Sequence, residues 1–294
     1  MKNKVLSYCL FKPKIMPAHR THDSHKNDED RYWFNIPAVA ITNYILYPKH
    51  EMRLYLTLNI VDHPLFEILS LLEKETNLST KIIDMDYAGT EPAIWRMMPL
   101  WEPETAVVHM RDIDSIPTEV EYRYTMAFEE SSCTIGTLRT HTNHYGIKCR
   151  MLAGLSSFKP EEVPGYMKYS NFYTYYAMRP SGYGSDQDMM IQQFTTNPDY
   201  TQEHFYDHCA YFQNNPQDFP CKKTTEDELG SIPVTSEQES LFSLLQKFKL
   251  DNWAGEPVDS RGAYTNSLLS LFPIVEREIK SSNILRSFYT KRGV

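Results

Sequence analysis

The chain has 294 residues, of which 41% are hydrophobic and 13% aromatic, so it can form one large domain or two small ones around a packed core. Its formal net charge of −8 and the lack of a dense basic stripe argue against a nucleic-acid partner. No run of about 18 apolar residues is present, so we expect no integral membrane segment. The five cysteines are scattered without a CxxC pair, which argues against a cysteine zinc site and favours a reducing, cytoplasmic location.

The first half of the chain alternates between strand and helix patterns. Short apolar or alternating runs predict strands at residues 5–11, 53–59, 81–84 and 105–111. Apolar residues at helical spacing predict helices at 32–47, 64–75 (with Pro64 in the first turn), 93–100 and 119–130. This alternation predicts an α/β fold with a parallel sheet.

The second half is less regular. Residues 197–230 are polar and rich in Asp, Gln and Pro. An amphipathic helix is predicted at 236–248, where apolar residues recur along one face. We therefore expect a catalytic domain over residues 1–230 and a helical extension over 231–294 that packs on it.

Two pairs of acidic residues accompany predicted strand ends. Asp112 and Asp114 follow the strand at 105–111, and Asp84 and Asp86 lie at the end of the strand at 81–84. The i, i+2 spacing can aim both carboxylates at one face, and paired carboxylates suit Mg²⁺ or Mn²⁺ that holds substrate phosphates. In an α/β sheet, ligands bind outside the carboxyl ends of the strands. We favour the later pair, because a buried apolar strand precedes it.

Two arginines lie close to this pair in the sequence. Arg96, in the helix before the strand, can bind a diphosphate bidentately, or it can form an ordinary surface salt bridge. Arg111 directly precedes the acids and would orient them or a sugar hydroxyl.

Further polar residues follow at wider spacing. His144 belongs to an Arg- and His-containing segment that could form a pocket wall, and Gly154 would let the backbone approach a ligand. Asp186 and Gln187 open a predicted helix, where Asp186 is either a helix cap or a group that faces a reacting sugar. His208 could serve as a metal ligand through its neutral imidazole, and each histidine could equally be an ordinary surface residue.

Together these segments resemble nucleotide-sugar glycosyltransferases of the GT-A fold. Arg-Asp-Ile-Asp-Ser at 111–115 is similar to the R-D-x-D-S strand end of a group of bacterial and viral glycosyltransferase-like proteins. Tyr-Gly-Ser-Asp-Gln at 183–187 resembles the Y-G-x-D-Q element of the same group. Residues 139–144 and 153–157 stand where the group has R-D-H-P-x-H and A-G-M-W-G, with Thr140 in place of Asp. The layout is more distantly similar to glycogenin and to bacterial lipooligosaccharide galactosyltransferases.

The resemblance implies a GT-A-like, Rossmann-type mixed sheet flanked by helices, with an irregular C-terminal part. It implies a metal-dependent, hexosyltransferase-like enzyme that moves a sugar from a nucleoside diphosphate sugar to a glycan or other glycoconjugate hydroxyl, with retention. A viral member of the group would work in the host cytoplasm. An inverting enzyme would need a carboxylate base, which Asp186 or Asp188 could supply, so the stereochemistry stays open.

The resemblance also assigns roles to individual residues. The catalytic residues would be Asp186 and Gln187, and the ligands of Mn²⁺ or Mg²⁺ would be Asp112, Asp114 and His208. The donor nucleotide sugar would be bound by Tyr8, Arg96, Arg111, Asp112, His144 and Gly154.

Two other functions stay open. A sugar-phosphate nucleotidyltransferase could use the same acids, although residues 10–14 lack the glycine of the usual phosphate loop. A non-catalytic carbohydrate-binding protein on the same fold would suit the tyrosine-rich second half. Metal-dependent hydrolysis of a donor would distinguish an enzyme from a binding protein.

Overall fold

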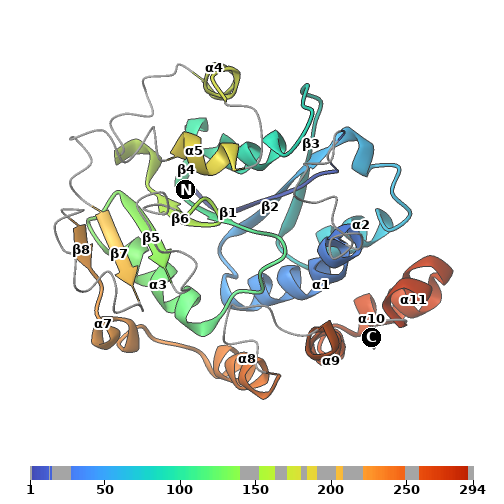
Figure 1. The fold of residues 1–294 in the computed structure, drawn as a ribbon. Coiled ribbons are helices and arrows are strands. Elements are labelled where there is room, and N and C mark those ends of the chain that lie inside the picture. The colour runs from blue at the N-terminus through green and yellow to red at the C-terminus, as the bar shows by residue number, and fades with distance from the viewer. Residues whose placement is uncertain are drawn as a thin grey trace.

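A computed structural model describes residues 2–12, 14, 28–139, 152–162, 171–179, 184–190, 203–207, 221–248 and 258–290. These residues form one mixed sheet with helices on both faces (Figure 1). The expected fold class, an α/β mixed sheet flanked by helices, is confirmed.

The sheet has eight strands in the order β3-β2-β1-β4-β6-β5-β7-β8. The strands are β1 (Asn3–Leu10), β2 (Glu51–Thr57), β3 (Leu78–Ile83), β4 (Thr105–Arg111), β5 (Ile135–Arg139), β6 (Leu155–Phe158), β7 (Glu203–Asp207) and β8 (Cys221–Lys223). Strand β6 is antiparallel to both of its neighbours, β4 and β5, and the other neighbouring pairs are parallel. The sheet is therefore mixed rather than wholly parallel, and the four strands predicted in the first half form one of its two parallel parts; β5, β7 and β8 form the other.

The helices cover the sheet in two layers. They are α1 (Asp28–Leu46), η3 (Leu58–Ile60), α2 (Glu67–Glu75), η4 (Glu91–Trp101), α3 (Glu119–Glu130), η7 (Pro160–Glu162), α4 (Phe172–Ala177), α5 (Ser185–Met190), α7 (Glu226–Gly230), α8 (Ser236–Lys247), α9 (Val258–Leu269), α10 (Pro273–Ser281) and α11 (Asn283–Thr290). Two predictions need correction. Pro64 precedes α2 instead of lying in its first turn, and the helix predicted at 93–100 is a 3₁₀ helix that contains two prolines, which cannot donate backbone hydrogen bonds.

Alternate residues of the central strands face two separate hydrophobic cores. Leu6, Tyr8 and Leu10 of β1 belong to the core shared with α1 and the C-terminal helices. Val5 and Cys9 belong to the core on the other face, under η4, α4 and α5. This follows from the two-residue period of a strand, and it decides which side chains can reach a site at the strand ends.

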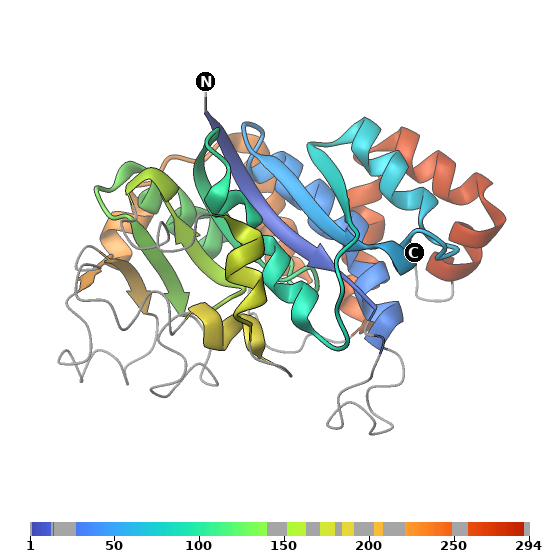
Figure 2. The ribbon, with the colours of Figure 1, turned by 90° about the horizontal axis from the view of Figure 1, so that it is seen from above.

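The C-terminal part of the chain forms helices α7 to α11 among its described residues, and the helix predicted at 236–248 is α8. Thr225 and Thr235 start α7 and α8 with capping boxes. Helices α8 and α9 contact α1, and α10 contacts α2, as Figure 2 shows for the C-terminal helices. The domain boundary expected at residue 230 stays a prediction. No helix in the described part of the chain combines the length and apolar character needed to span a bilayer.

Candidate functional site

The acidic pair at 112 and 114 lies at the point where the strand order reverses. Strand β1 has β2 on one side and β4 on the other, and the crevice at such a switch point is the usual ligand site of an open α/β sheet. Strand β4 ends at Arg111, and a turn closed by the Ser115 amide and the Asp112 carbonyl follows at 3.1 Å. Asp112 and Asp114 are partly exposed, whereas Ile113 between them is buried. Both acids are therefore partly accessible to solvent, with a buried side chain between them.

Arg96 joins this pair to a distant part of the chain. Its guanidinium is buried, and it donates to the carboxylates of both Asp112 and Asp186. It also donates to the carbonyl oxygen of Arg111 at 3.2 Å. Ser7 of β1 donates to the carbonyl oxygen of Arg96 at 2.7 Å, which anchors η4 on the sheet. We call Arg96, Asp112 and Asp186 the switch-point cluster; its arginine forms a buried bridge instead of a surface salt bridge.

The charges of this cluster act on one another and on the end of β1. Burial would lower the pKa of Arg96, but the carboxylates of Asp112 and Asp186 outweigh it and raise that pKa. Burial raises the pKa of Cys9 to about 12; Arg96 opposes this, and Asp112, Asp186 and Asp114 add to it. The Cys9 thiol therefore stays protonated, and all four charged groups lie close enough to influence it.

Gly154 brings a second backbone segment against the acidic pair. A Cβ atom at this position would lie 1.9 Å from Oδ2 of Asp112, so no side chain fits without moving that carboxylate. The adjacent Ala153 amide donates to Oε1 of Gln187 at 2.9 Å, which ties the same turn to α5. The sequence predicts that Gly154 lets the backbone approach a ligand. In the structure, the group that lies against Gly154 is the carboxylate of Asp112.

The start of α5 depends on a glycine that we did not single out from the sequence. Gly184 has a φ of +80°, a left-handed conformation that disfavours side chains with a Cβ atom. Asp188 donates its amide to the Gly184 carbonyl at 2.9 Å, so the helix starts directly after this turn. The turn brings Asp186 to Arg96; the signal in the sequence was the glycine two residues before the acid.

Two of the predicted donor-binding side chains lie in the protein interior. Tyr8 is fully buried, its hydroxyl accepts from Nδ2 of Asn43 at 2.9 Å, and burial raises its pKa. Arg111 is buried, pairs with Glu121 and donates to Oγ1 of Thr125 at 2.9 Å. Both residues point to the α1 and α3 face, because strand alternation places them there. Both side chains therefore have partners within the core, and their role in donor binding stays a prediction.

The remaining predicted residues are less informative. His144 and His208 lie outside the described residues. The competing pair, Asp84 and Asp86, follows β3 at the edge of the sheet, and Asp86 is exposed over 98% of its side chain, with Lys14 at 3.5 Å. The choice of Asp112 and Asp114 over the earlier acids stays a prediction, and the observation in its favour is the buried Arg96 that pairs with Asp112.

The acidic pair has the donor chemistry for a hard divalent cation. Carboxylate oxygens are the ligands that Mg²⁺ and Mn²⁺ prefer. Arg96 occupies Oδ1 of Asp112, which leaves the other oxygen outside that ion pair. Within the described residues, no further His, Cys, Asp or Glu completes a three-ligand group around Asp112, so water and substrate oxygens would supply the other positions.

Comparisons with known proteins give no family. No family model matches the sequence, and no curated protein matches it. Among solved structures, S. aureus TarS 1–349 in complex with UDP-GlcNAc has a TM-score of 0.43 and 13% identity, over 99% of this chain and 79% of that one. The 4-diphosphocytidyl-2C-methyl-D-erythritol synthase of Anaerococcus prevotii has a TM-score of 0.39 and 10% identity, over 83% of this chain and 96% of that one. At these TM-scores neither structure defines the fold or function of this chain.

Proposed function

We propose that this protein is a metal-dependent glycosyltransferase that moves a sugar from a nucleoside diphosphate sugar to a glycan or glycoconjugate hydroxyl, with retention at the anomeric carbon. The observation that carries the proposal is the buried Arg96 that holds Asp112 and Asp186 together at the switch point of the sheet. The two acids belong to the segments that resemble R-D-x-D-S and Y-G-x-D-Q, and they are 74 positions apart in the sequence.

The net charge of the site supports metal dependence. Among the described residues, Arg96 is the cation that acts on this site together with the carboxylates of Asp112, Asp114 and Asp186. A diphosphate brought to this negative group would be repelled unless a divalent cation came with it. Asp112 and Asp114 would hold that cation, with His208 as a further ligand. When bound, Mn²⁺ or Mg²⁺ neutralises the charge that develops on the leaving diphosphate.

The other residues have positioning roles in this proposal. The guanidinium of Arg96 is shared between two acids, so it keeps both in place more than it serves as a free phosphate ligand. Asp186 and Gln187 would position the donor sugar, and the Ala153 amide restrains Gln187. In the reaction, the bond from the anomeric carbon to the diphosphate breaks, a bond to the acceptor oxygen forms, and the acceptor proton ends on the diphosphate.

The experiment is nucleotide release from UDP-, GDP-, CMP- and dTDP-sugars, with Mn²⁺ or with EDTA, before any acceptor is known. We expect one nucleotide class to be hydrolysed slowly with Mn²⁺ and not with EDTA. Asp112→Asn removes one carboxylate charge at almost constant volume and should lower the rate at least about 100-fold. Asp86→Asn is the matched control, because it makes the same change in the exposed pair at the sheet edge.

Three results would contradict the proposal. Equal rates for Asp112→Asn and wild type would remove the acidic pair from the chemistry. Donor binding without turnover under any metal would favour the carbohydrate-binding alternative. Release of pyrophosphate from a nucleoside triphosphate and a sugar phosphate would favour the nucleotidyltransferase.

A further inference from the structure

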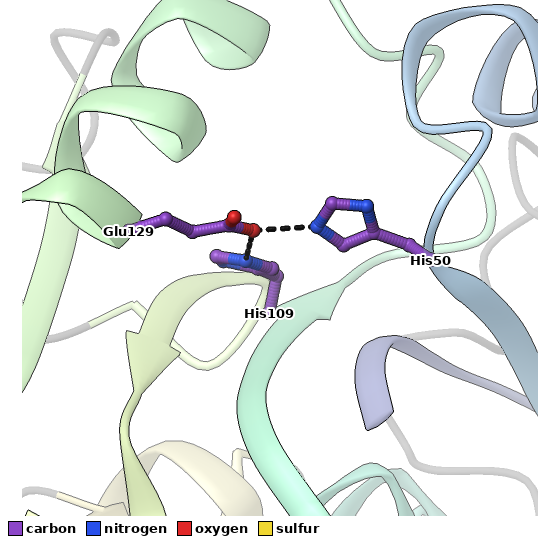
Figure 3. A group of neighbouring side chains, drawn as sticks. All are labelled: His50, His109 and Glu129. Carbon is purple, nitrogen blue, oxygen red and sulfur yellow. Dashed lines mark hydrogen bonds and ion pairs between the residues drawn. The ribbon is translucent and has the colours of Figure 1, made fainter. Parts of the chain in front are cut away.

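Three side chains from separate elements meet on the other side of β4. Nε2 of His50 lies 2.5 Å from Oε1 of Glu129, and Nε2 of His109 lies 3.0 Å from the same oxygen (Figure 3). His50 directly precedes β2, His109 is in β4 and Glu129 is at the end of α3. One ligand atom from each residue lies within 4.8 Å of the other two. We call these three residues the histidine cluster.

We propose that the histidine cluster is a structural site for a divalent transition metal, with Zn²⁺ as its best-suited ion. Two imidazole nitrogens and one carboxylate oxygen form a donor set that zinc uses in proteins, whereas Mg²⁺ and Ca²⁺ prefer oxygen ligands. The site is separate from the switch-point cluster, where the available ligands are carboxylates.

The surroundings of the cluster fix which atom of His109 and of Glu129 is available. Nδ1 of His109 is hydrogen-bonded to Oγ of Ser157 at 2.7 Å, which orients the ring and leaves Nε2 facing Glu129. Lys4 donates to Oε2 of Glu129, so Oε1 is the oxygen that faces the histidines. Such outer contacts to the second atom of a ligand are typical of metal sites, because they hold the first atom in place.

Two of the three ligand separations in the cluster are close to those around a zinc ion. Ligand atoms about 2.0 to 2.1 Å from a tetrahedral zinc ion lie about 3.3 Å apart. The two nitrogen–oxygen distances, 2.5 Å from His50 and 3.0 Å from His109 to Oε1 of Glu129, are each within about 1 Å of that spacing. The described residues offer no fourth His, Cys, Asp or Glu within this group, so a water molecule would complete the coordination.

Burial indicates a structural role for such an ion. His109 is fully buried and His50 is 5% exposed, while the Lys4 side chain is 39% exposed and reaches solvent from the cluster. An ion here would connect β4, the start of β2 and the end of α3, and it would stabilise the folded state because the unfolded chain lacks the site.

The first test uses metal ions alone on the full chain after removal of bound metal with a chelator. Co²⁺ is the probe, because tetrahedral Co²⁺ with nitrogen ligands absorbs visible light, and Zn²⁺ should displace it. We expect these bands in wild type and in Asp112→Asn, together with a higher unfolding temperature when Zn²⁺ is added. A wild-type protein without the bands, or an Asp112→Asn variant that loses them, would overturn the proposal.

The second test removes one ligand. His50→Gln should weaken Zn²⁺ binding at least tenfold, while His63→Gln, which alters a histidine stacked on Trp33 outside the cluster, should leave it unchanged. Equal Zn²⁺ affinity in His50→Gln and wild type would overturn the proposal. If His50→Gln does not fold, ¹⁵N-histidine NMR of wild type decides: Zn²⁺ must shift the Nε2 signals of two histidines, and unchanged signals would contradict the site.

Discussion

Two charged clusters lie next to strand β4, and they differ in how far each is open to solvent. In the switch-point cluster, Arg96 is buried between two acids, but 44% of the Asp112 side chain is exposed. In the histidine cluster, Glu129 is only 5% exposed, and its oxygens are occupied by Lys4, His50 and His109. The first cluster keeps a carboxylate open to a ligand from solution, whereas the second is closed within the protein. The exposed carboxylate of Asp112 therefore distinguishes the candidate active site from the histidine cluster, where the carboxylate of Glu129 is buried.

Protonation sharpens this difference. Burial lowers the pKa of His109 to about 4, so its imidazole is neutral at pH 7. The pKa of Glu129 is also lowered; burial opposes this change, but the hydrogen bonds from His109 and His50 outweigh it. At neutral pH, the histidine cluster thus contains a carboxylate and a neutral ring, while the switch-point cluster contains several full charges.

The largest effect on turnover within this comparison is expected for Asp186→Asn. The change removes one of the two acids that hold Arg96, and a lost positioning charge in a protected site lowers the rate by about 100-fold or more. Because the metal-binding pair is untouched, nucleotide affinity with Mn²⁺ should stay within about threefold. Steady-state kinetics and nucleotide binding measure the two effects.

Asp188→Asn provides the comparison on the same helix, since Asp188 is exposed. We expect near-normal turnover from this variant. A large loss for Asp188→Asn with a normal Asp186→Asn would transfer the role to Asp188 and favour an inverting mechanism.

Arg111→Met should affect stability more than turnover. The Arg111–Glu121 pair is buried, with 3% and 5% of the two side chains exposed, and leaving Glu121 unpaired costs about 3 kcal/mol or more. Urea unfolding measures this loss. Lys280→Met, which breaks the exposed pair with Glu276, should cost less than about 0.5 kcal/mol. A stable Arg111→Met with weak donor binding would restore the donor-binding role that the sequence suggested.

Gly154→Ala should lower turnover at least tenfold and also reduce stability. The new methyl group would overlap Oδ2 of Asp112, and displacing this carboxylate, which Arg96 holds, costs about 1 to 3 kcal/mol. Gly230→Ala is the control, because a Cβ atom there meets nothing within 4 Å. Normal turnover in Gly154→Ala would show that the exact position of the Asp112 carboxylate is unimportant.

Gly184→Ala should give the smallest effect. Space is available for the methyl group, so the cost comes from the φ of +80° alone and is about 1 kcal/mol. Thermal unfolding measures it. An unchanged unfolding temperature would show that the turn before α5 relaxes freely, and that Asp186 does not depend on it.

The sequence predicts the strands and helices around the site better than it predicts which side chains form the site. Local periodicity predicts β1, β2, β4 and α3, and the acids that follow β4 are recognisable by their position. Local pattern alone separates Asp112 weakly from Asp86, because the difference between them is the place of each strand in the sheet: β4 is next to the reversal and β3 is at the edge.

Two features of the structure that the site prediction did not include have identifiable causes. Tyr8 shares a strand face with Leu6 and Leu10, so the two-residue period already placed it in the core, and the expectation of a nucleotide contact overlooked that signal. The histidine cluster was not found, because His50, His109 and Glu129 lie in separate segments with no ligand spacing between them. Such sites depend on tertiary packing and leave no local pattern.

The most direct measurement is thermal unfolding of wild type and Asp112→Asn with each nucleotide sugar, at one fixed concentration of Mn²⁺. A ligand that binds only the folded state raises the unfolding temperature, and a fixed metal concentration keeps any effect of the histidine cluster equal in both proteins. We predict that one nucleotide class stabilises wild type but not Asp112→Asn. Equal stabilisation of both proteins, or stabilisation of neither by any nucleotide sugar, would contradict the assignment of the switch-point cluster as the donor site.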